Sequence, residues 1–410
     1  MRSGPIAVLD VGTAKVCCFI ARREGDSPPR IVGIGHQVSR GLRAGGVVDM
    51  EAAEASIGQA VHAAEQMAGE TIRSVVVNAA AGHPTSHTVD VEVAIAGHAV
   101  GDGDLRRALG QGHAVNGYGE RELIHSLPVG YAIDGDRGIR DPRGMYGQRL
   151  GVHMHLVTAA AGAVRNLRTC IERCHLDVEG LAVNPYAAGV AALVEDEKDL
   201  GVTVIDMGAG TTSLAVFFGG QAVFTDAVAV GGGHVTNDIA RGLSTPVAVA
   251  ERIKTLHGCA TASADDERHT IDVPQVGEDD AGAPNPVPRS LLNRIIQPRL
   301  EETLELVRGR LEASGLDRLA GRRVVLTGGA SQLQGVREIA ALILDKQVRT
   351  GRPLGARGLA DSVSGPAFAT AAGLVVLAGA SAPGLVPAIE TKVEPSGLSG
   401  RVGQWVREHL

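Results

Sequence analysis

The sequence predicts an α/β protein made of two related halves, and three segments carry this prediction. They are IAVLDVGTAKVCCFI at 6–20, GVTVIDMGAGTTSLAVF at 201–217 and RVVLTGGASQLQG at 323–335. In the first two, an apolar run typical of a buried strand ends in an aspartate, and glycines and threonines lead into a second apolar run. Two copies of one hairpin in distant parts of the chain indicate two related halves that face each other.

The two hairpins have the composition of phosphate-binding turns. Glycine permits positive φ and lets the backbone come close to a ligand, and backbone N–H groups with threonine hydroxyls can surround phosphate oxygens. Asp10 and Asp206 end the leading strands, where a carboxylate could hold a hydrated Mg²⁺. Each hairpin alone is equally compatible with an ordinary turn capped by its aspartate, so the prediction depends on the matched pair. The phosphate candidates are Gly12, Thr13, Gly208, Gly210, Thr211 and Thr212.

The third segment completes a nucleotide site. After its Val-Val-Leu strand, Gly328 and Gly329 suit the close approach of an adenine-ribose. Together the three segments resemble the superfamily of actin, sugar kinases and chaperone ATPases, whose members close two α/β domains on ATP and Mg²⁺. The resemblance implies an actin-like (ribonuclease H-like) two-domain ATPase fold.

Length and composition exclude several classes of protein. The 410 residues suffice for two or three domains, and only 2% are aromatic, so we expect a core of Val, Leu, Ala and Ile. A net charge of −7 gives no general basic field for nucleic acid. The cysteines lack the spacing of a metal site, so we expect buried, reduced thiols rather than zinc ligands at Cys17, Cys18, Cys170, Cys174 and Cys259.

The sequence also bears on membrane association. The chain starts almost directly on a strand, without the pattern of a signal peptide. We find no apolar stretch of the roughly 18–20 residues that a membrane-spanning helix needs. We therefore expect a soluble or peripheral protein.

The first half begins at residues 1–83. After the first hairpin, residues 31–38 and 75–77 have strand composition, and Asp49 can cap a helix over residues 50–68. The apolar positions of this helix share one face, namely Ala53, Ile57, Ala60, Val61, Ala64 and Met67.

An inserted small α+β subdomain is expected at residues 84–160. Its predicted parts are strands at 89–95, 123–129 and 151–157, a short helix at 103–112 and a polar loop at 134–147. Residues 161–200 then return to the first half, with a helix at 166–174 and another that begins after Asn184 and Pro185.

The second half is expected at residues 201–378, with residues 245–320 as its outer subdomain. Gly231, Gly232 and Gly233 precede a helix that Thr or Asp can cap, so its N–H donors should point to the phosphate site. In a helix at 248–256, Glu251 and Lys254 form either a surface ion pair, worth about 0.2–0.5 kcal/mol, or contacts to ribose or adenine.

The outer subdomain continues with an exposed loop containing one strand at 262–290 and a long helix at 290–314, interrupted at Pro298. The arginines of this helix are either a solvated face or a partner site. The half ends with a strand at 324–327 and a core helix at 367–382. The helix arginines are Arg294, Arg299, Arg308 and Arg310.

The end of the chain changes in character. Residues 379–396 are rich in Pro and Gly and predict a flexible linker. Residues 397–410 predict an amphipathic helix that either docks on the protein itself or lies on anionic lipid. One short helix binds lipid weakly, and polymerisation would add avidity. The apolar face and its basic flanks are Leu398, Arg401, Val402, Trp405, Val406, Arg407 and Leu410.

Seven segments spread along the chain share one family pattern. They are, in order, LDVGTAKVC, YAIDGDRGIRDPRGMYG, DLGVTVIDMGAGTTSLAVF, VGGGHVTNDIARGL, AERIKTLHGCA, VLTGGASQLQGV and QWVREHL. On these segments, the chain resembles the FtsA family of actin-like bacterial cell division proteins over essentially its whole length. The inserted subdomain separates this family from rod-shape actins and sugar kinases.

The resemblance implies ligands and residue roles. ATP and Mg²⁺ would be bound, with Asp10 and Asp206 facing the metal and Lys15 joining the phosphate residues. Gly231–Gly233, Glu251, Lys254, Gly328 and Gly329 would line the nucleoside side.

The resemblance also implies partners and a location. Arg294 and Arg299 would meet the acidic C-terminal tail of FtsZ, the tubulin-like ring protein. The other partners would be further copies of the chain in a filament, anionic membrane lipid through residues 397–410, and later division proteins. The protein would work at the cytoplasmic face of the bacterial inner membrane, at the division site.

One segment departs from the family pattern. Many relatives carry Gln or Glu to orient the attacking water where this chain reads VNPYAAG. Asn184 is shorter and precedes Pro185, and such a group needs hydrogen-bond reach of about 2.6–3.2 Å. We therefore expect slow or negligible ATP hydrolysis, with Asn184 a weak catalytic candidate and ATP a structural ligand and polymerisation switch. The alternatives are a small-metabolite kinase, for which we find no suitable base, and an actin-like pilus-assembly adaptor.

Overall fold

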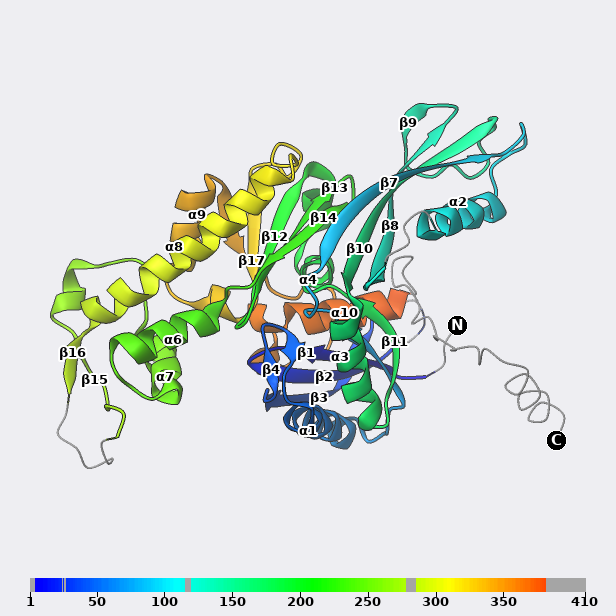
Figure 1. The fold of residues 1–410 in the computed structure, drawn as a ribbon. Coiled ribbons are helices and arrows are strands. Elements are labelled where there is room, and N and C mark those ends of the chain that lie inside the picture. The colour runs from blue at the N-terminus through cyan, green and yellow to red at the C-terminus, as the bar shows by residue number, and fades with distance from the viewer. Residues whose placement is uncertain (1–3, 24, 26, 115–118, 278–284, 381–410) are drawn as a thin grey trace, which may run out of the picture.

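The computed structural model describes residues 4–23, 25, 27–114, 119–277 and 285–380. Two five-stranded sheets lie one above the other in Figure 1, with helices α4 (Asn184–Ala192) and α10 (Ala369–Ala380) between them. A four-stranded sheet projects from one end of this body, and an arm of helices extends from the other. The amphipathic helix predicted at 397–410, and residues 381–396 of the predicted linker, lie outside the described residues.

The first sheet has the strand order β11-β6-β1-β2-β3. Helices α1 (Met50–Ala68) and α3 (Ala161–Arg173) cover one face, and α10 covers the other. Helix α1 begins where predicted, because the Asp49 carboxylate accepts the Ala52 N–H at 3.1 Å. The strands are β1 (Ile6–Val11), β2 (Lys15–Arg22), β3 (Arg30–Val38), β6 (Ser74–Asn78) and β11 (Asp177–Ala182), with a short hairpin of β4 (Leu42–Arg43) and β5 (Gly46–Val47) beside them.

The second sheet repeats the first, strand for strand, in the order β14-β13-β12-β17-β18. In each sheet a hairpin pairs antiparallel and its first strand pairs parallel with a later one, Leu9 with Val77 and Ile205 with Leu326. The prediction of two related halves is thus confirmed. The strands are β12 (Val202–Met207), β13 (Thr212–Phe218), β14 (Gln221–Val228), β17 (Arg323–Thr327) and β18 (Gln347–Thr350).

The inserted subdomain, residues 85–160, is a sheet of order β7-β10-β8-β9 packed on α2 (Asp102–Ala114). Its two ends are adjacent, because the Ala160 N–H donates to the Gly82 carbonyl at 2.9 Å. The prediction of a polar loop at 134–147 was partly wrong, since this segment contains strand β9, which pairs with β8. Most side chains of β9 are exposed, so its sequence lacks the apolar pattern of a strand. The strands are β7 (Thr85–Ala94), β8 (Arg121–Ile133), β9 (Asp136–Ile139) and β10 (Arg149–Ala160).

The inserted subdomain also binds the second half. Buried His155, on β10, hydrogen-bonds the Ala222 carbonyl through Nδ1 at 2.8 Å and the Ser86 hydroxyl through Nε2 at 2.7 Å. The same hydroxyl meets both the N–H and the carbonyl of Thr225 at 2.7 Å. Strand β14 is the outer strand of its sheet, so these side chains satisfy backbone groups that an edge strand would otherwise leave unpaired.

The arm of the second half lies on the outer face of the second sheet. It contains α6 (Gly232–Gly242), α7 (Val247–His257), the 3₁₀ turn η1 (Ala264–Glu267), β15 (Thr270–Asp272), β16 (Pro286–Pro288) and α8 (Arg289–Ala313). The predicted interruption at Pro298 is wrong, because α8 runs through it. Proline removes one backbone bond and costs about 3 kcal/mol, and burial of Ile296 and Leu300 on either side offsets this cost.

Several smaller predictions also need correction. Strand β11 was not predicted, α3 begins earlier than expected at Ala161, and the 262–290 segment contains two short strands instead of one. Met67 is exposed, although it was assigned to the buried face of α1. Helix α6 begins on glycine and lacks the expected Thr or Asp side-chain cap. The remaining helices are α5 (Glu195–Leu200) and α9 (Val336–Leu344). The 3₁₀ turn η2 (Gly329–Gln332) precedes α9, and the 3₁₀ turns η3 (Asp361–Val363) and η4 (Pro366–Phe368) follow it.

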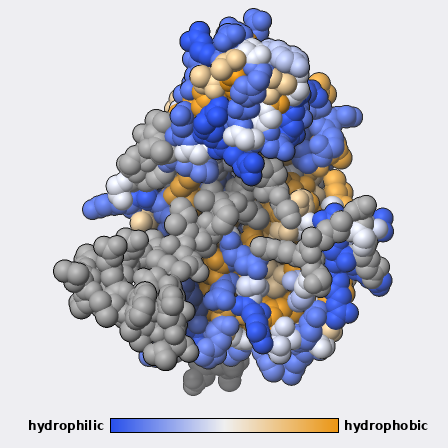
Figure 2. Space-filling view, turned by 90° about the vertical axis from the view of Figure 1, so that its right-hand side faces the viewer, coloured by the Kyte–Doolittle hydropathy of each residue, from blue (hydrophilic) through white to orange (hydrophobic). Residues whose placement is uncertain are grey.

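Three further features can be compared with the sequence-based expectations, namely the polarity of the surface, the length and polarity of the helices, and the state of the cysteines. Viewed from the side of the inserted subdomain, the described surface is mostly hydrophilic with smaller hydrophobic areas (Figure 2). Among the residues that the structure describes, every helix is too short or too polar to span a bilayer. The cysteines are free thiols, and all but Cys174 are fully buried.

We expect His155 to make the stability depend on pH. Burial lowers the pKa of His155 to about 4, from about 6.5 in an unfolded chain. Between these values the unfolded chain binds more protons, so the free energy of unfolding should fall as pH drops from about 6.5 to 4. The thermal midpoint, followed by circular dichroism, should therefore depend less steeply on pH in His155→Gln than in the wild type.

The matched control is His153→Gln, because His153 is on the same strand and is exposed beside Asp90. Its pH profile should match that of the wild type. Equal slopes for His155→Gln and the wild type would contradict the role of His155.

Candidate nucleotide site

The two hairpins close in the same way. In the first turn, residues 12–14, the Gly12 N–H donates to the Lys15 carbonyl at 2.9 Å, and in the second turn, residues 208–211, the Gly208 N–H donates to the Thr211 carbonyl at 2.9 Å. A Cβ atom would lie 3.1 Å from the accepting oxygen at Gly12 and 3.0 Å at Gly208. A side chain at either position would therefore crowd the oxygen that closes the turn, and the turn would have to shift by a few tenths of an ångström to admit it.

The two turns meet where the halves join. A Cβ at Gly210 would lie 2.5 Å from the Thr13 hydroxyl and 2.9 Å from Cα of Ala44. The Thr13 hydroxyl accepts the Gly45 N–H at 3.1 Å. Thr212 begins β13 and is buried, and its hydroxyl has no partner among the described residues. The structure thus brings the two predicted turns into contact through Gly210 and Thr13, beside a buried hydroxyl, that of Thr212, which no described residue satisfies.

The two aspartates lie beside these turns and are almost completely buried. Burial raises the pKa of Asp10, and burial followed by the nearby Asp10 charge raises the pKa of Asp206 to about 6, while the Lys15 ammonium acts in the opposite direction on both. No cluster of three or more metal-ligating side chains occurs in the described part of the chain. Two buried carboxylates, one of which raises the pKa of the other, suit a cation that takes one or two carboxylates together with phosphates and water, as Mg²⁺ does.

Lys15 is held by the segment that leads into α10. Its ammonium donates to the Ala367 carbonyl and lies 3.6 Å from the centre of the Phe368 ring. A cation over an aromatic face is attracted by the ring quadrupole. The first hairpin is therefore attached to the central helix α10 as well as to its own sheet.

Asp206 has partners that the sequence did not reveal. The Thr370 hydroxyl donates to its carboxylate at 3.2 Å, and the nearby Asn184 side chain lowers the Asp206 pKa. Asn78 in turn donates to the Asn184 side-chain oxygen at 3.2 Å. Asn78 ends a Val-Val-Val strand parallel to β1, and a polar residue at the carboxyl end of a parallel strand is a signal that could have identified it.

The glycines at 231–233 support the second turn instead of offering free donors. The Gly232 N–H donates to the Gly208 carbonyl at 2.9 Å, and the Gly233 N–H donates to the Ala209 carbonyl at 2.8 Å. The Gly231 N–H is bonded to His234 at 3.1 Å. The expectation that these N–H groups point to a ligand therefore does not fit this structure.

The residues predicted to line the nucleoside side lie near the glycines at 231–233. The Lys254 ammonium bonds the Glu251 carboxylate at 2.6 Å, the Thr236 hydroxyl at 2.8 Å and the Gly232 carbonyl at 3.1 Å. Gly328 has a φ of 85° and packs against Asp206, whereas Gly329 faces open space. Glu251 and Lys254 therefore form the predicted ion pair, and the pair also ties α7 to the start of α6.

The predicted partner residues are on α8, away from the two turns. Arg299 Nε lies 2.5 Å from the Asp238 carboxylate, and its guanidinium also pairs with Glu302. Arg294 pairs with Glu267 at 3.0 Å and is the more exposed of the two arginines. Both charges already have intramolecular partners, which an acidic peptide would have to displace.

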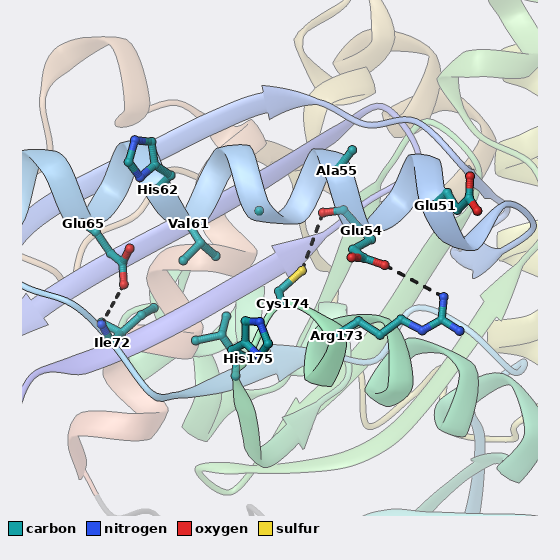
Figure 3. Close-up of a pocket in the computed structure, with 12 residues that line it drawn as sticks. Glu51, Glu54, Ala55, Val61, His62, Glu65, Ile72, Arg173, Cys174 and His175 are labelled. Carbon is teal, nitrogen blue, oxygen red and sulfur yellow. Dashed lines mark hydrogen bonds and ion pairs between the residues drawn. The ribbon is translucent and has the colours of Figure 1, made fainter.

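A separate pocket of about 730 Å³ lies between α1 and the end of α3 (Figure 3). Its lining includes Glu54, which lies 3.9 Å from the Arg173 guanidinium, and Glu65, which accepts the Ile72 N–H at 2.8 Å. With Glu51 added, three carboxylates and the single guanidinium of Arg173 line this space, so its net charge does not favour phosphates.

We expect Gly210→Ala to separate the two turns. The added methyl group would overlap Thr13 and the Ala44 backbone, so the junction must open. The thermal midpoint should fall by several degrees, since about 1–3 kcal/mol of overpacking strain shifts it by roughly 2–4 °C per kcal/mol in a large domain. Gly162→Ala is the matched control, because it adds the same group in helix α3, where nothing lies within 4 Å. Equal midpoints for the two variants would contradict the close contact.

The two matching sheets, their hairpins and the central helices define an actin-like ATPase fold. Solved structures agree with this class. The PilM-PilN type IV pilus biogenesis complex matches with a TM-score of 0.63 at 18% identity, covering 92% of this chain and 99% of that one. MreB5 of Spiroplasma citri bound to ADP matches with a TM-score of 0.54 at 15% identity, covering 92% and 97%. Identities this low establish the fold alone.

Sequence comparison identifies the family. The chain is 46% identical to the cell division protein FtsA of Agrobacterium fabrum, over 99% of this chain and 95% of that protein. It is 34% identical to FtsA of Escherichia coli strain K12, over 97% and 95%. Family profiles described as "Cell division protein FtsA" and "SHS2 domain inserted in FTSA" match residues 203–373 and 81–158. The chain belongs to the FtsA family of cell division proteins.

Proposed function

We propose that this protein binds ATP with Mg²⁺ at the junction of its two halves, polymerises, and attaches FtsZ filaments to the inner face of the cytoplasmic membrane. The observation that carries the nucleotide site is the contact between two identically closed glycine turns, with one buried aspartate beside each. Solved structures of MreB5, which share the fold, are described as bound to ADP and to AMPPNP. Asp10 and Asp206 would hold the Mg²⁺, largely through water, and the metal would neutralise phosphate charge.

The residue set at the turns fits a triphosphate better than a small neutral ligand. Lys15 supplies a positive charge, the turns supply glycine backbone, and Thr13, Thr211 and Thr212 supply hydroxyls. Glu251, Lys254, Gly328 and Gly329 would line the nucleoside side. Gly231–Gly233 would act indirectly, by holding the second turn.

We further propose that ATP hydrolysis is slow. A residue that orients the attacking water needs a free polar atom within hydrogen-bond reach. The Asn184 oxygen accepts from Asn78, and the Asn184 side chain lowers the Asp206 pKa, so the side chain is oriented by protein groups. It is also one methylene shorter than the Gln or Glu of many relatives. Asn184 would therefore hold the site together rather than activate water, and ATP would act as a structural ligand that favours assembly.

We expect Asp206→Asn to lose Mg²⁺-dependent ATP binding while it stays folded. Removing one carboxylate relieves its repulsion with Asp10, so the thermal midpoint should not fall. The affinity for Mg·ATP, measured by isothermal titration calorimetry, should drop by about tenfold or more. The control is Asp90→Asn, the same change at an exposed position of the inserted subdomain.

An unchanged affinity in Asp206→Asn would mean that the nucleotide lies elsewhere. The same wild-type preparation also tests slow hydrolysis. A steady-state turnover above about 1 s⁻¹, at the low end of ordinary enzymes, would contradict it.

The membrane and FtsZ roles rest on the sequence and on family membership. Residues 397–410 have the amphipathic pattern of an interfacial helix, and Arg294 presents the more accessible guanidinium on α8. A single short helix binds lipid weakly, so a filament of many copies would be needed for firm attachment. The inserted subdomain would serve contacts between copies and with later division proteins.

We expect one vesicle assay to separate these two roles. Anionic vesicles, the protein and a fluorescent peptide of the FtsZ tail are mixed and sedimented. The wild type should carry the peptide into the pellet, and a variant without residues 396–410 should leave both in the supernatant. Arg294→Glu should stay in the pellet but release the peptide, because the reversed charge repels acidic groups. Arg308→Glu, on the same helix, is the control that should still carry it.

Equal pelleting with and without residues 396–410 would remove the membrane role of that segment. Equal peptide capture by Arg294→Glu and Arg308→Glu would move the FtsZ site away from Arg294. Arg299→Glu is less suitable as a probe, because it would also set a second negative charge against Asp238.

A further inference from the structure

Asn78 is a fully buried polar residue that lies between the first turn and the central helix α4. Its side-chain oxygen accepts the Val11 N–H at 2.6 Å, and its amide nitrogen donates to the Val11 carbonyl at 3.3 Å and to the Asn184 oxygen at 3.2 Å. Val11 directly precedes Gly12, and Asn184 is the first residue of α4. One amide therefore connects the phosphate turn of the first half to a helix that lies between the halves.

The connection continues into the second half. The Asp206 carboxylate accepts the Thr370 hydroxyl from α10, and the Asn184 side chain lies near enough to lower the Asp206 pKa. An amide offers an acceptor oxygen and two N–H donors, and Asn78 uses both kinds at once. A carboxylate would lack the donors, and an aliphatic side chain would lack both.

The second half shows that the fold does not require this amide. Leu9 pairs with Val77 and Ile205 pairs with Leu326, so Asn78 and Thr327 occupy equivalent positions at the ends of β6 and β17. Within the described part of the chain, the Thr327 hydroxyl makes one hydrogen bond, to the Pro366 carbonyl at 3.0 Å. A shorter hydroxyl is therefore enough to end this strand, and the longer amide at Asn78 adds the reach to Asn184.

We propose that Asn78 is a positioning residue for Mg·ATP, which fixes Asn184 and through it the Asp206 carboxylate relative to the first turn. This inference rests on the nucleotide site proposed above. Groups that orient the residues facing a metal usually affect metal affinity strongly, because they set the direction of the carboxylate. Asn78 itself would touch neither the metal nor the nucleotide.

The test uses the Asn78→Thr variant of the full-length protein. Threonine is chosen because Thr327 occupies the equivalent position in the second half. Affinities for a fluorescent ATP analogue are measured with Mg²⁺ and with EDTA. The ratio of the two affinities should fall by about tenfold in the variant, while binding in EDTA should change less than twofold. Asn184→Ala, at a half-buried position, should show the same loss, and the double variant should lose no more than either single one.

The possible outcomes separate the two proposals. If the wild type shows no Mg²⁺-dependent binding, the nucleotide site is wrong and the role of Asn78 falls with it. If the wild type binds but Asn78→Thr keeps the full Mg²⁺ effect, only the role of Asn78 is overturned. That role is also overturned if the two single losses add in the double variant, or if Asn78→Thr weakens binding equally with Mg²⁺ and EDTA. If Asn78→Thr does not fold, a full Mg²⁺ effect in Asn184→Ala would overturn the proposal.

Discussion

The contact between two glycine turns governs the rest of this structure. At Gly210 the second turn lies so close to Thr13 that no side chain fits between them. The contact fixes where the two sheets meet, and it places Asp10 and Asp206 near enough for the charge of one to affect the other. Like-charged carboxylates in a buried setting raise each other's pKa unless a cation offsets them, so the same constraint that joins the halves also makes the charge of Lys15 important for both aspartates.

The central helices tie this junction together. Lys15, from the first half, is bound by the segment that leads into α10, while Asp206, from the second half, accepts a hydrogen bond from α10 and lies near Asn184 at the start of α4. Each hairpin thus depends on helices that belong to neither sheet. A change in the distance between the turns must therefore move these helices or break their bonds to the hairpins. Breaking the bonds is costly, because polar side chains in a buried site lose their partners when they separate.

The sequence predicted the local features and missed the long-range ones. The hairpins, the cap at Asp49 and the inserted subdomain follow from patterns within a few residues, and the structure has all three. Asn78 and Thr370 were missed because their bonds span 106 and 164 positions in the chain, and such pairs depend on how the sheets dock. Tertiary packing also explains α8, where the core on both sides of Pro298 overrides the local preference for a break.

The inserted subdomain looks at first like a removable module. Its two ends are joined by a hydrogen bond between Gly82 and Ala160, so a very short linker could bridge the gap. Removal would nevertheless uncover β14, leaving the carbonyl of Ala222 and both backbone groups of Thr225 without their partners. The shortened protein would therefore expose β14 as an edge strand that tends to pair with other chains. A stable deletion variant would need charged residues or a proline in place of the present β14 sequence.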